Sequence, residues 1–248
     1  MQPKAPYAHL LIGDGHYRGE PGEAMALTRL LTRALAQGAT ELSILGDFFD
    51  LWVALPQTQA PGETPLVTVL RSFKARGLKL RYVVGNRDYL VPEWNTREHL
   101  FDEVVTESVT LDTPAGLLHL AHGDLVNLAD RPYRSWRAFS RGPLVHGLAH
   151  ALPKRAMLAL ANRMAQRLKH TNQRHKSYFP EAALRDYARR LPDAPATLVF
   201  GHFHLHREFT EGNKHIVTLP YLGGDNAGVL ITSTGLHRLN GKDPQQVG

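Results

Sequence analysis

Short apolar runs that end in glycine alternate with amphipathic segments over the first third of the chain. The runs cover residues 8–12, 41–45 and 78–84, and each is followed directly by a glycine. Between them, apolar residues spaced three and four apart predict helices over about residues 23–36 and 65–76. A helix that connects two such strands returns the chain to the same end of a sheet, so the strands run parallel. The pattern therefore predicts an α/β fold, with a parallel or mixed sheet covered by helices.

The remainder of the 248-residue chain is richer in strands. A hairpin is predicted over residues 105–122, with its turn at residues 112–115. A helix near 181–191 follows, and then strands near residues 196–200, 214–219, 227–232 and 235–239. This length suits one large domain with an insertion. We expect one domain over residues 1–240, with a basic helical insertion at about 131–176 and a disordered tail over 241–248.

The insertion has an unusual charge distribution. Residues 131–176 contain 11 Lys and Arg and no Asp or Glu, whereas the rest of the chain has 18 basic and 23 acidic residues. Helical spacing of its apolar residues predicts two amphipathic helices on either side of Pro153. Their apolar positions are Leu144, Val145, Leu148, Ala151 and Leu152, and then Met157, Leu158, Ala161, Met164, Ala165 and Leu168. Such helices can pack on the body of the protein, lie on an anionic membrane or bind nucleic acid.

The amino-acid composition excludes several classes of functional site. The chain has no cysteine, which excludes disulfides, thiolate zinc sites, iron–sulfur clusters and cysteine nucleophiles. Any metal must therefore be bound by His, Asp, Glu or Asn. The apolar run near the N-terminus is too short for a signal peptide, so a cytoplasmic location is expected. No run reaches the 18 or so apolar residues of a membrane span, so any membrane contact is expected to be peripheral.

Polar residues follow five successive predicted strands, where open α/β sheets bind their ligands. Taken alone, the Asp-x-His, Gly-Asp-x-x-Asp and Gly-Asn-x-Asp motifs are more simply turns or helix caps. His202 and His204 are a stronger signal, because alternate residues of a strand place both rings on one face. Their common position at strand ends favours a metal site with mixed nitrogen and oxygen ligands, in which a shared carboxylate holds two ions close together. The motifs are Gly13-Asp14-Gly15-His16, Gly46-Asp47-Phe48-Phe49-Asp50, Gly85-Asn86-Arg87-Asp88, His122-Gly123-Asp124 and Gly201-His202-Phe203-His204.

In these motifs the chain resembles the calcineurin-like metallophosphoesterases, and within them the UDP-2,3-diacylglucosamine hydrolases of lipid A biosynthesis. Arg87 in the third motif, Trp52 after the second, and Asp130 and Tyr133 after the fourth carry the closer resemblance. The resemblance implies a calcineurin-like mixed β-sandwich flanked by helices, with a helical insertion. Two departures leave the substrate open. Val53-Ala54-Leu55 follows Trp52 where the family usually has Ile-Gly-Asp-Asp, and Leu205-His206 stands in place of Arg-Pro.

The resemblance also implies roles for individual residues. Asp14, His16 and His204 would bind one divalent ion, Asn86, His122 and His202 the other, and Asp47 would bridge the two, with Mn²⁺ as the expected metal. Asn86, Arg87 and His122 are the expected catalytic residues, and Arg87, Asp130 and Tyr133 the expected substrate-binding residues. Asp50 and Asp88 would orient ligands, and Asp124 would orient His122.

The implied reaction cleaves UDP-2,3-diacylglucosamine to UMP and a diacylglucosamine 1-phosphate. The expected partner is thus a lipid-linked nucleotide sugar, with peripheral contact at the cytoplasmic face of the inner membrane and no nucleic acid or protein partner. Two alternatives remain: a metallophosphodiesterase for soluble or nucleic-acid phosphodiesters, and a metal-free adaptor, which would have no need for seven metal ligands.

Four residues in or near the motifs have simpler explanations. His206 continues the spacing of His202 and His204, but the family uses two of the three, so a structural role is expected. His119 is expected to be a packed neighbour of His122, and Trp52 a core or rim aromatic. Arg87 could also be an ordinary surface arginine of a turn.

Overall fold

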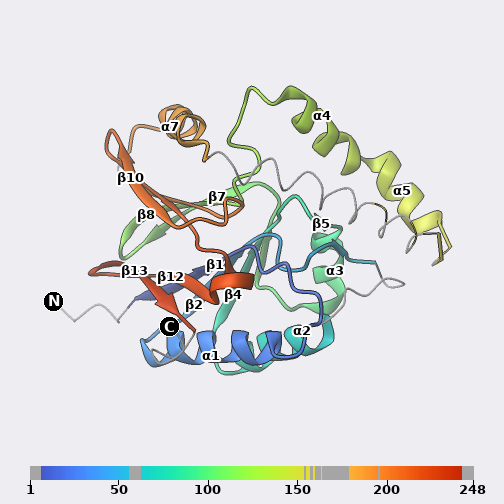
Figure 1. Ribbon diagram of the computed structural model, residues 1–248, viewed down its shortest axis with the longest axis horizontal. Coiled ribbons are helices and arrows are strands. Elements are labelled where there is room, and N and C mark those ends of the chain that lie inside the picture. The colour runs from blue at the N-terminus through green and yellow to red at the C-terminus, as the bar shows by residue number, and fades with distance from the viewer. Residues whose placement is uncertain are drawn as a thin grey trace.

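The computed structural model describes residues 7–55, 63–153, 179–194 and 196–241, together with residues 155, 156, 159 and 163. Most of the predicted second helix of the insertion, and the predicted tail beyond Gly241, lie outside these residues. Two β-sheets pack face to face, with helices outside both of them (Figure 1). The predicted mixed β-sandwich flanked by helices is therefore confirmed.

The larger sheet contains the three strands predicted first. Its order is β13-β12-β1-β2-β4-β6. The pairs β1–β2, β2–β4 and β4–β6 are parallel, whereas β12 pairs antiparallel with β1 and with β13. The strands are β1 Ala8–Ile12, β2 Glu41–Leu45, β4 Lys79–Val83, β6 Glu103–Val105, β12 Ala227–Thr232 and β13 Gly235–Asn240.

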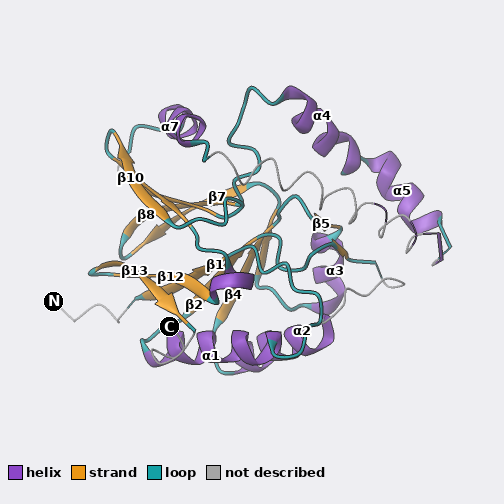
Figure 2. Ribbon diagram, in the orientation of Figure 1, coloured by secondary structure: helices purple, strands orange, loops and turns teal. Residues whose placement is uncertain are grey.

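The smaller sheet has the order β10-β11-β9-β8-β7 and is also mixed. Its strands are β7 Ser108–Thr113, β8 Gly116–Ala121, β9 Ala196–Phe200, β10 Arg207–Glu211 and β11 Lys214–Thr218. A two-stranded sheet pairs β3 (Trp52–Val53) with β5 (Asp88–Tyr89) beside the first (Figure 2). Part of the predicted hairpin is shifted, because Val105 ends β6 in the larger sheet and the hairpin begins only at Ser108.

Side-chain alternation along the strands divides the core into layers. On β1, Leu10 and Ile12 pack against α1 (Glu23–Ala36) and α2 (Glu63–Ala75), whereas Leu11 packs between the two sheets. On the outer face of the smaller sheet, α7 (Glu181–Arg190) buries Leu184 and Ala188. The predicted helices over 23–36, 65–76 and 181–191 thus correspond closely to α1, α2 and α7.

Four further helices complete the described fold, and three of them carry or approach the insertion. They are α3 Val91–Glu98, α4 Arg131–Ser140, α5 Pro143–Ala151 and α8 Leu222–Asp225. α4 and α5 lie end to end on the side of the molecule where α3 and β5 lie (Figure 1). α5 corresponds to the first predicted amphipathic helix, but α4 was not predicted. No helix within the described residues is both long and apolar enough to cross a bilayer.

A series of hydrogen-bonded polar side chains is buried along neighbouring strands of the larger sheet. His9 of β1 contacts Tyr7 Oη through Nδ1 at 3.0 Å and Ser43 Oγ of β2 through Nε2 at 2.8 Å. Arg81 of β4 reaches the same serine and pairs with Glu103 of β6. Burial, reinforced by the charges of Arg81 and Lys79, lowers the pKa of His9 to about 3.

The lowered pKa of His9 predicts that the folded state loses stability in acid. His9 is neutral in the native state but takes up a proton in the unfolded state below about pH 6.5, so stability is lost as the pH falls through that window. We expect His9→Gln to be less stable than wild type at pH 7 because it keeps fewer hydrogen bonds. The difference in unfolding free energy should shrink by about 2 to 3 kcal/mol between pH 7 and pH 4.5.

Urea unfolding of both proteins in chelator, with exposed His237→Gln as the control, measures this difference. A difference that does not change with pH would show that His9 is not held neutral by burial.

Candidate metal centre

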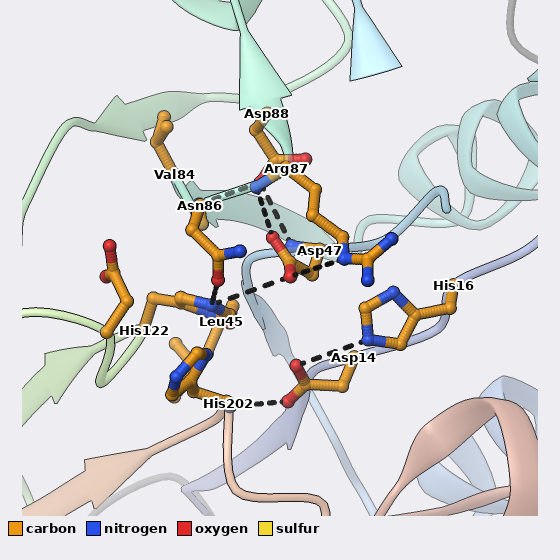
Figure 3. Close-up of polar contacts among 12 residues, drawn as sticks. Asp14, His16, Leu45, Asp47, Val84, Asn86, Arg87, Asp88, His122 and His202 are labelled. Carbon is orange, nitrogen blue, oxygen red and sulfur yellow. Dashed lines mark hydrogen bonds and ion pairs between the residues drawn. The ribbon is translucent and has the colours of Figure 1, made fainter. Parts of the chain in front are cut away.

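The carboxyl ends of strands from both sheets meet at one junction. All seven predicted metal ligands lie in the loops that follow β1, β2, β4, β8 and β9. Figure 3 shows Asp14, His16, Asp47, Asn86, His122 and His202. The structure brings these loops within hydrogen-bond distance of one another: Asp14 N–H donates to Gly46 O, and His202 N–H donates to Asp14 Oδ2 at 2.6 Å. Residues separated by up to 190 positions in the sequence therefore form one cluster.

Asp14, His16 and His204 form the first half of this cluster. The Nε2 atoms of His16 and His204 are 3.0 Å apart, and they lie 3.8 and 3.4 Å from Asp14 Oδ1. Asp14 Oδ1 is buried and has no hydrogen-bond partner among the described residues. Three ligand atoms converging at these separations fit a single metal ion.

The second half contains Asn86, His122 and His202 beside Asp47. His122 Nδ1 donates to Leu45 O at 2.7 Å, so Nε2 is the ring nitrogen that faces the cluster. That Nε2 faces Asn86 Oδ1 at 3.0 Å and Asp47 Oδ2 at 3.7 Å. The His202 ring packs edge-on against His122, with 5.1 Å between ring centroids. Acceptors converge in this way around a proton or a metal cation, and ligand atoms of Asp14, Asp47 and His122 lie within 4.8 Å of one another, which fits a second ion. His202 lies beside this set through its ring contact with His122.

Left-handed backbone conformations concentrate at the ligand residues among the described part of the chain. Five of the seven have a left-handed φ between 45° and 69°: Asp14, His16, Asp47, His202 and His204. Non-glycine residues adopt this region at a cost, and such residues concentrate at functional sites. The expectation that strand alternation places the His202 and His204 rings on one face is wrong, because both residues lie in a loop after β9.

Two glycines allow the loops to approach closely. Gly46 has a φ of 77°, and a Cβ there would lie 2.6 Å from the backbone of Gly85. A Cβ on Gly85 would lie 2.4 Å from Asp47 Oδ1. Only Gly46 supplies a left-handed turn among the glycines that precede ligands. At Gly85 the requirement is space for the Asp47 carboxylate.

The junction concentrates buried negative charge. Burial, together with the carboxylates of Asp88 and Asp14, raises the pKa of Asp47 to about 7. Burial opposes protonation of His122, but the carboxylates of Asp47 and Asp14 outweigh it and raise its pKa to about 9. Burial lowers the pKa of His202 to about 4, which keeps it neutral and able to ligate. The donor set therefore favours cations at this junction.

Arg87 is buried, not a surface arginine of a turn, since only 2% of it is exposed. Its backbone N–H donates to Asp47 Oδ1, and its guanidinium reaches toward His16 and Asp47 (Figure 3). Nη1 donates to the backbone and side-chain oxygens of Asp50. The guanidinium is thus fixed beside the ligand cluster.

Neighbouring carboxylates hold the loops in place. Asp88 Oδ2 accepts from the backbone N–H groups of Asp47 and Gly85, at 3.0 and 2.7 Å. Asp124 accepts from Tyr133 Oη and Arg137 Nε. The expectation that Asp124 orients His122 is not met by a direct hydrogen bond, because the Leu45 carbonyl oxygen contacts His122 Nδ1 instead.

The predicted substrate-binding residues at the start of the insertion have structural contacts. Asp130 caps α4 by accepting from the backbone N–H of Tyr133, and the Tyr133 hydroxyl binds Asp124. Arg141, at the end of α4, was not singled out in the sequence. Its Nη2 donates to the carbonyl oxygens of Gly85 and Asp88, so the insertion is tied directly to the third motif.

Tyr221, which precedes α8, was also not predicted. Its ring stacks on His204, with 4.6 Å between centroids and 3° between planes. No local motif marks this tyrosine, because its position depends on the contact of β11 with β9.

The remaining marked residues have the expected structural roles. His206 contacts Thr218 O and Glu208, away from the ligand cluster. His119 is buried between Thr110 and Tyr187. Trp52 lies in the core among Phe49, Tyr82, Trp94 and Phe101.

A groove of about 940 Å³ lies beneath the insertion and beside the third motif, and none of the seven predicted ligands is among its lining residues. Asp88 and Arg141 line it next to the third motif, and Trp136, Phe139, Leu148 and Leu152 of the insertion line it further out. Trp136, Phe139 and Leu148 are each more than half exposed. The apolar side of α5 therefore faces an open space and is not buried in the domain.

Curated proteins of similar sequence share one enzyme name, although no family model matches the chain. A protein of Stenotrophomonas maltophilia (strain K279a), named UDP-2,3-diacylglucosamine hydrolase, is 27% identical over 207 residues, which cover 79% of this chain and 81% of the relative. A protein of Serratia proteamaculans (strain 568) with the same name is 30% identical over 165 residues, covering 66% and 68%.

Among solved structures, the phosphoesterase Yfce from E. coli matches 90% of this chain and 87% of its own, at 18% identity and a TM-score of 0.44. The identity and coverage of the curated relatives establish the family. The chain belongs to the UDP-2,3-diacylglucosamine hydrolase family of calcineurin-like metallophosphoesterases and is a metal-dependent phosphoester hydrolase.

Proposed function

We propose that this enzyme cleaves the pyrophosphate of UDP-2,3-diacylglucosamine, or of a closely similar acylated nucleotide sugar, to UMP and a diacylated sugar 1-phosphate. The observation that carries the proposal is the apolar groove beside the third motif, where Asp88 and Arg141 line it. A soluble phosphodiester has no use for it, whereas acyl chains do, at roughly 0.8 kcal/mol for each methylene buried. The curated relatives bear the name of this activity.

Two Mn²⁺ ions are proposed as the resident metals. Asp14, His16 and His204 would hold one, Asn86, His122 and His202 the other, and Asp47 both. Bound ions of this kind lower the pKa of a coordinated water and stabilise negative charge on a phosphate. The Leu45 carbonyl fixes the tautomer of His122, and Asp88 fixes the loops that carry Asp47 and Asn86.

Arg87 is proposed to contact the scissile pyrophosphate. Its Nη1 is held by Asp50, so the orientation of the guanidinium is set before substrate binds. The positive charge lies where negative charge grows during attack on phosphorus, which favours the transition state over the ground state. Asp130 and Tyr133 would contribute to substrate binding by positioning α4 at the mouth of the groove.

Peripheral contact with the cytoplasmic face of the inner membrane is part of the proposal. Leu144 of α5 is 75% exposed and does not line the groove, so it could enter the membrane interface. Nucleic acid is the less favoured ligand. Arg137 is buried against Asp124, and Arg141 binds backbone oxygens, so two of the basic residues in the insertion face inward.

Substitutions of two leucines of α5 test acyl-chain binding in the groove and membrane contact separately. Leu148→Glu places a charge in the groove and should raise KM for a detergent-solubilised diacylated substrate about 10-fold or more, because a carboxylate disfavours an apolar site. Leu144→Glu should leave that KM near the wild-type value but weaken binding to anionic lipid vesicles.

Hydrolysis of a small soluble phosphodiester at the same metals provides the reference activity, and it should be equal in all three proteins. Circular dichroism checks that each variant is folded. Equal losses on both substrates, or wild-type cleavage of deacylated UDP-glucosamine as fast as of the diacylated form, would exclude an acyl-binding role for the groove.

Arg87→Lys tests the proposed phosphate contact. Lysine keeps the charge but cannot bind Asp50 and a phosphate oxygen with one planar group. We expect kcat/KM to fall roughly 5- to 150-fold, which corresponds to a loss of about 1 to 3 kcal/mol of transition-state stabilisation. The metal content should not change. Kinetics equal to wild type would rule out the contact, and loss of metal would assign Arg87 to the assembly of the site instead.

A further inference from the structure

A second group of side chains of the types that bind metals lies at the groove, apart from the ligand cluster. Glu93 belongs to α3, whereas His146 and His150 are one turn apart on α5. Glu93 Oε2 lies 2.7 Å from His146 Nε2, and Glu93 Oε1 lies 3.1 Å from His150 Nε2. The two imidazole rings are 4.8 Å apart, so both Nε2 atoms face the same carboxylate.

We propose that Glu93, His146 and His150 bind a third divalent transition-metal ion, with Zn²⁺ as the best match. Two histidines at i and i+4 on one helix face, joined by a carboxylate, supply the nitrogen and oxygen ligands that zinc uses with one position left for water. One potential ligand atom from each residue lies within 4.8 Å of the other two. A small outward shift from hydrogen-bond distance makes room for an ion.

The same geometry would serve less well as a simple ion pair. Two protonated imidazoles in contact would repel each other, and one carboxylate would have to compensate both charges. Arg97 also approaches Glu93, at 3.7 Å, but this is an exposed pair along one helix and is worth little. A dication satisfies both neutral histidines and the carboxylate together.

The location gives the ion a structural consequence. None of the nine residues of α5 is buried, so few contacts hold this helix against the body of the protein. Glu93 and His146 both line the groove. A cation bound between them would join α5 to α3 across the rim of the groove and fix the position of its apolar wall.

Metal stoichiometry tests the site directly. The untagged enzyme, equilibrated with Zn²⁺ and dialysed, is compared with His146→Ala/His150→Ala by elemental analysis. The control is His215→Ala/His237→Ala, which removes two histidines of the described surface that lie outside both clusters. We expect one equivalent fewer in the first variant and none fewer in the control. Metal at the sheet junction is common to all three proteins and cancels in the comparison.

Glu93→Gln provides a second variant that can still hydrogen-bond both histidines. It should also lose one equivalent, and hydrogen exchange of residues 143–151 should slow on Zn²⁺ addition in wild type but not in either cluster variant. Equal zinc content in wild type and both cluster variants would overturn the proposal and leave an ordinary hydrogen-bonded cluster. Loss of the equivalent in the control as well would assign it to nonspecific histidine binding.

Discussion

The buried carboxylates of Asp14, Asp47 and Asp88 impose the main physical constraint on this structure. All three are essentially excluded from solvent at the junction of two sheets, where an uncompensated negative charge costs several kcal/mol. Arg87 and a protonated His122 compensate part of this charge, and the raised pKa of Asp47 shows that compensation is incomplete in the protein alone. Left-handed ligand residues and the close contact of Gly46 with Gly85 keep the carboxylates together despite their repulsion. A site built in this way is suited to binding cations.

The same junction connects the metal centre to the insertion. Arg141 binds the carbonyl oxygens of Gly85 and Asp88, and Arg137 binds Asp124 after the fourth motif. Hydrogen bonds therefore hold α4 and the residue that follows it against the loops that carry the ligands. An acylated substrate in the groove would contact helices whose basic residues also hold the centre in place.

Much of the site could be predicted from sequence because its residues follow strands whose periodicity is clear. The strands over 8–12, 41–45 and 196–200 and the helix over 23–36 have the predicted bounds. α4 was missed because its exposed aromatics and arginines give no continuous apolar stripe, although Asp130 and Pro132 are ordinary signals of a helix start. Contacts such as Leu45 O with His122, Tyr221 with His204 and Glu93 with His146 join distant segments. No local pattern encodes them, so they required the tertiary structure.

The most direct test of this electrostatic account is the stability of Asp47→Asn with and without metal. Asparagine keeps an oxygen for the Arg87 N–H but removes the charge. Above pH 7 without metal, the raised pKa of Asp47 means that its ionised form destabilises the native state, so the variant should be more stable than wild type, by about 1 to 4 kcal/mol at pH 7.5. With saturating Mn²⁺ the order should reverse, because the variant loses a ligand. Urea unfolding at pH 7.5 in chelator and in Mn²⁺ measures both, and a variant that is less stable than wild type by the same amount in both conditions would contradict the account.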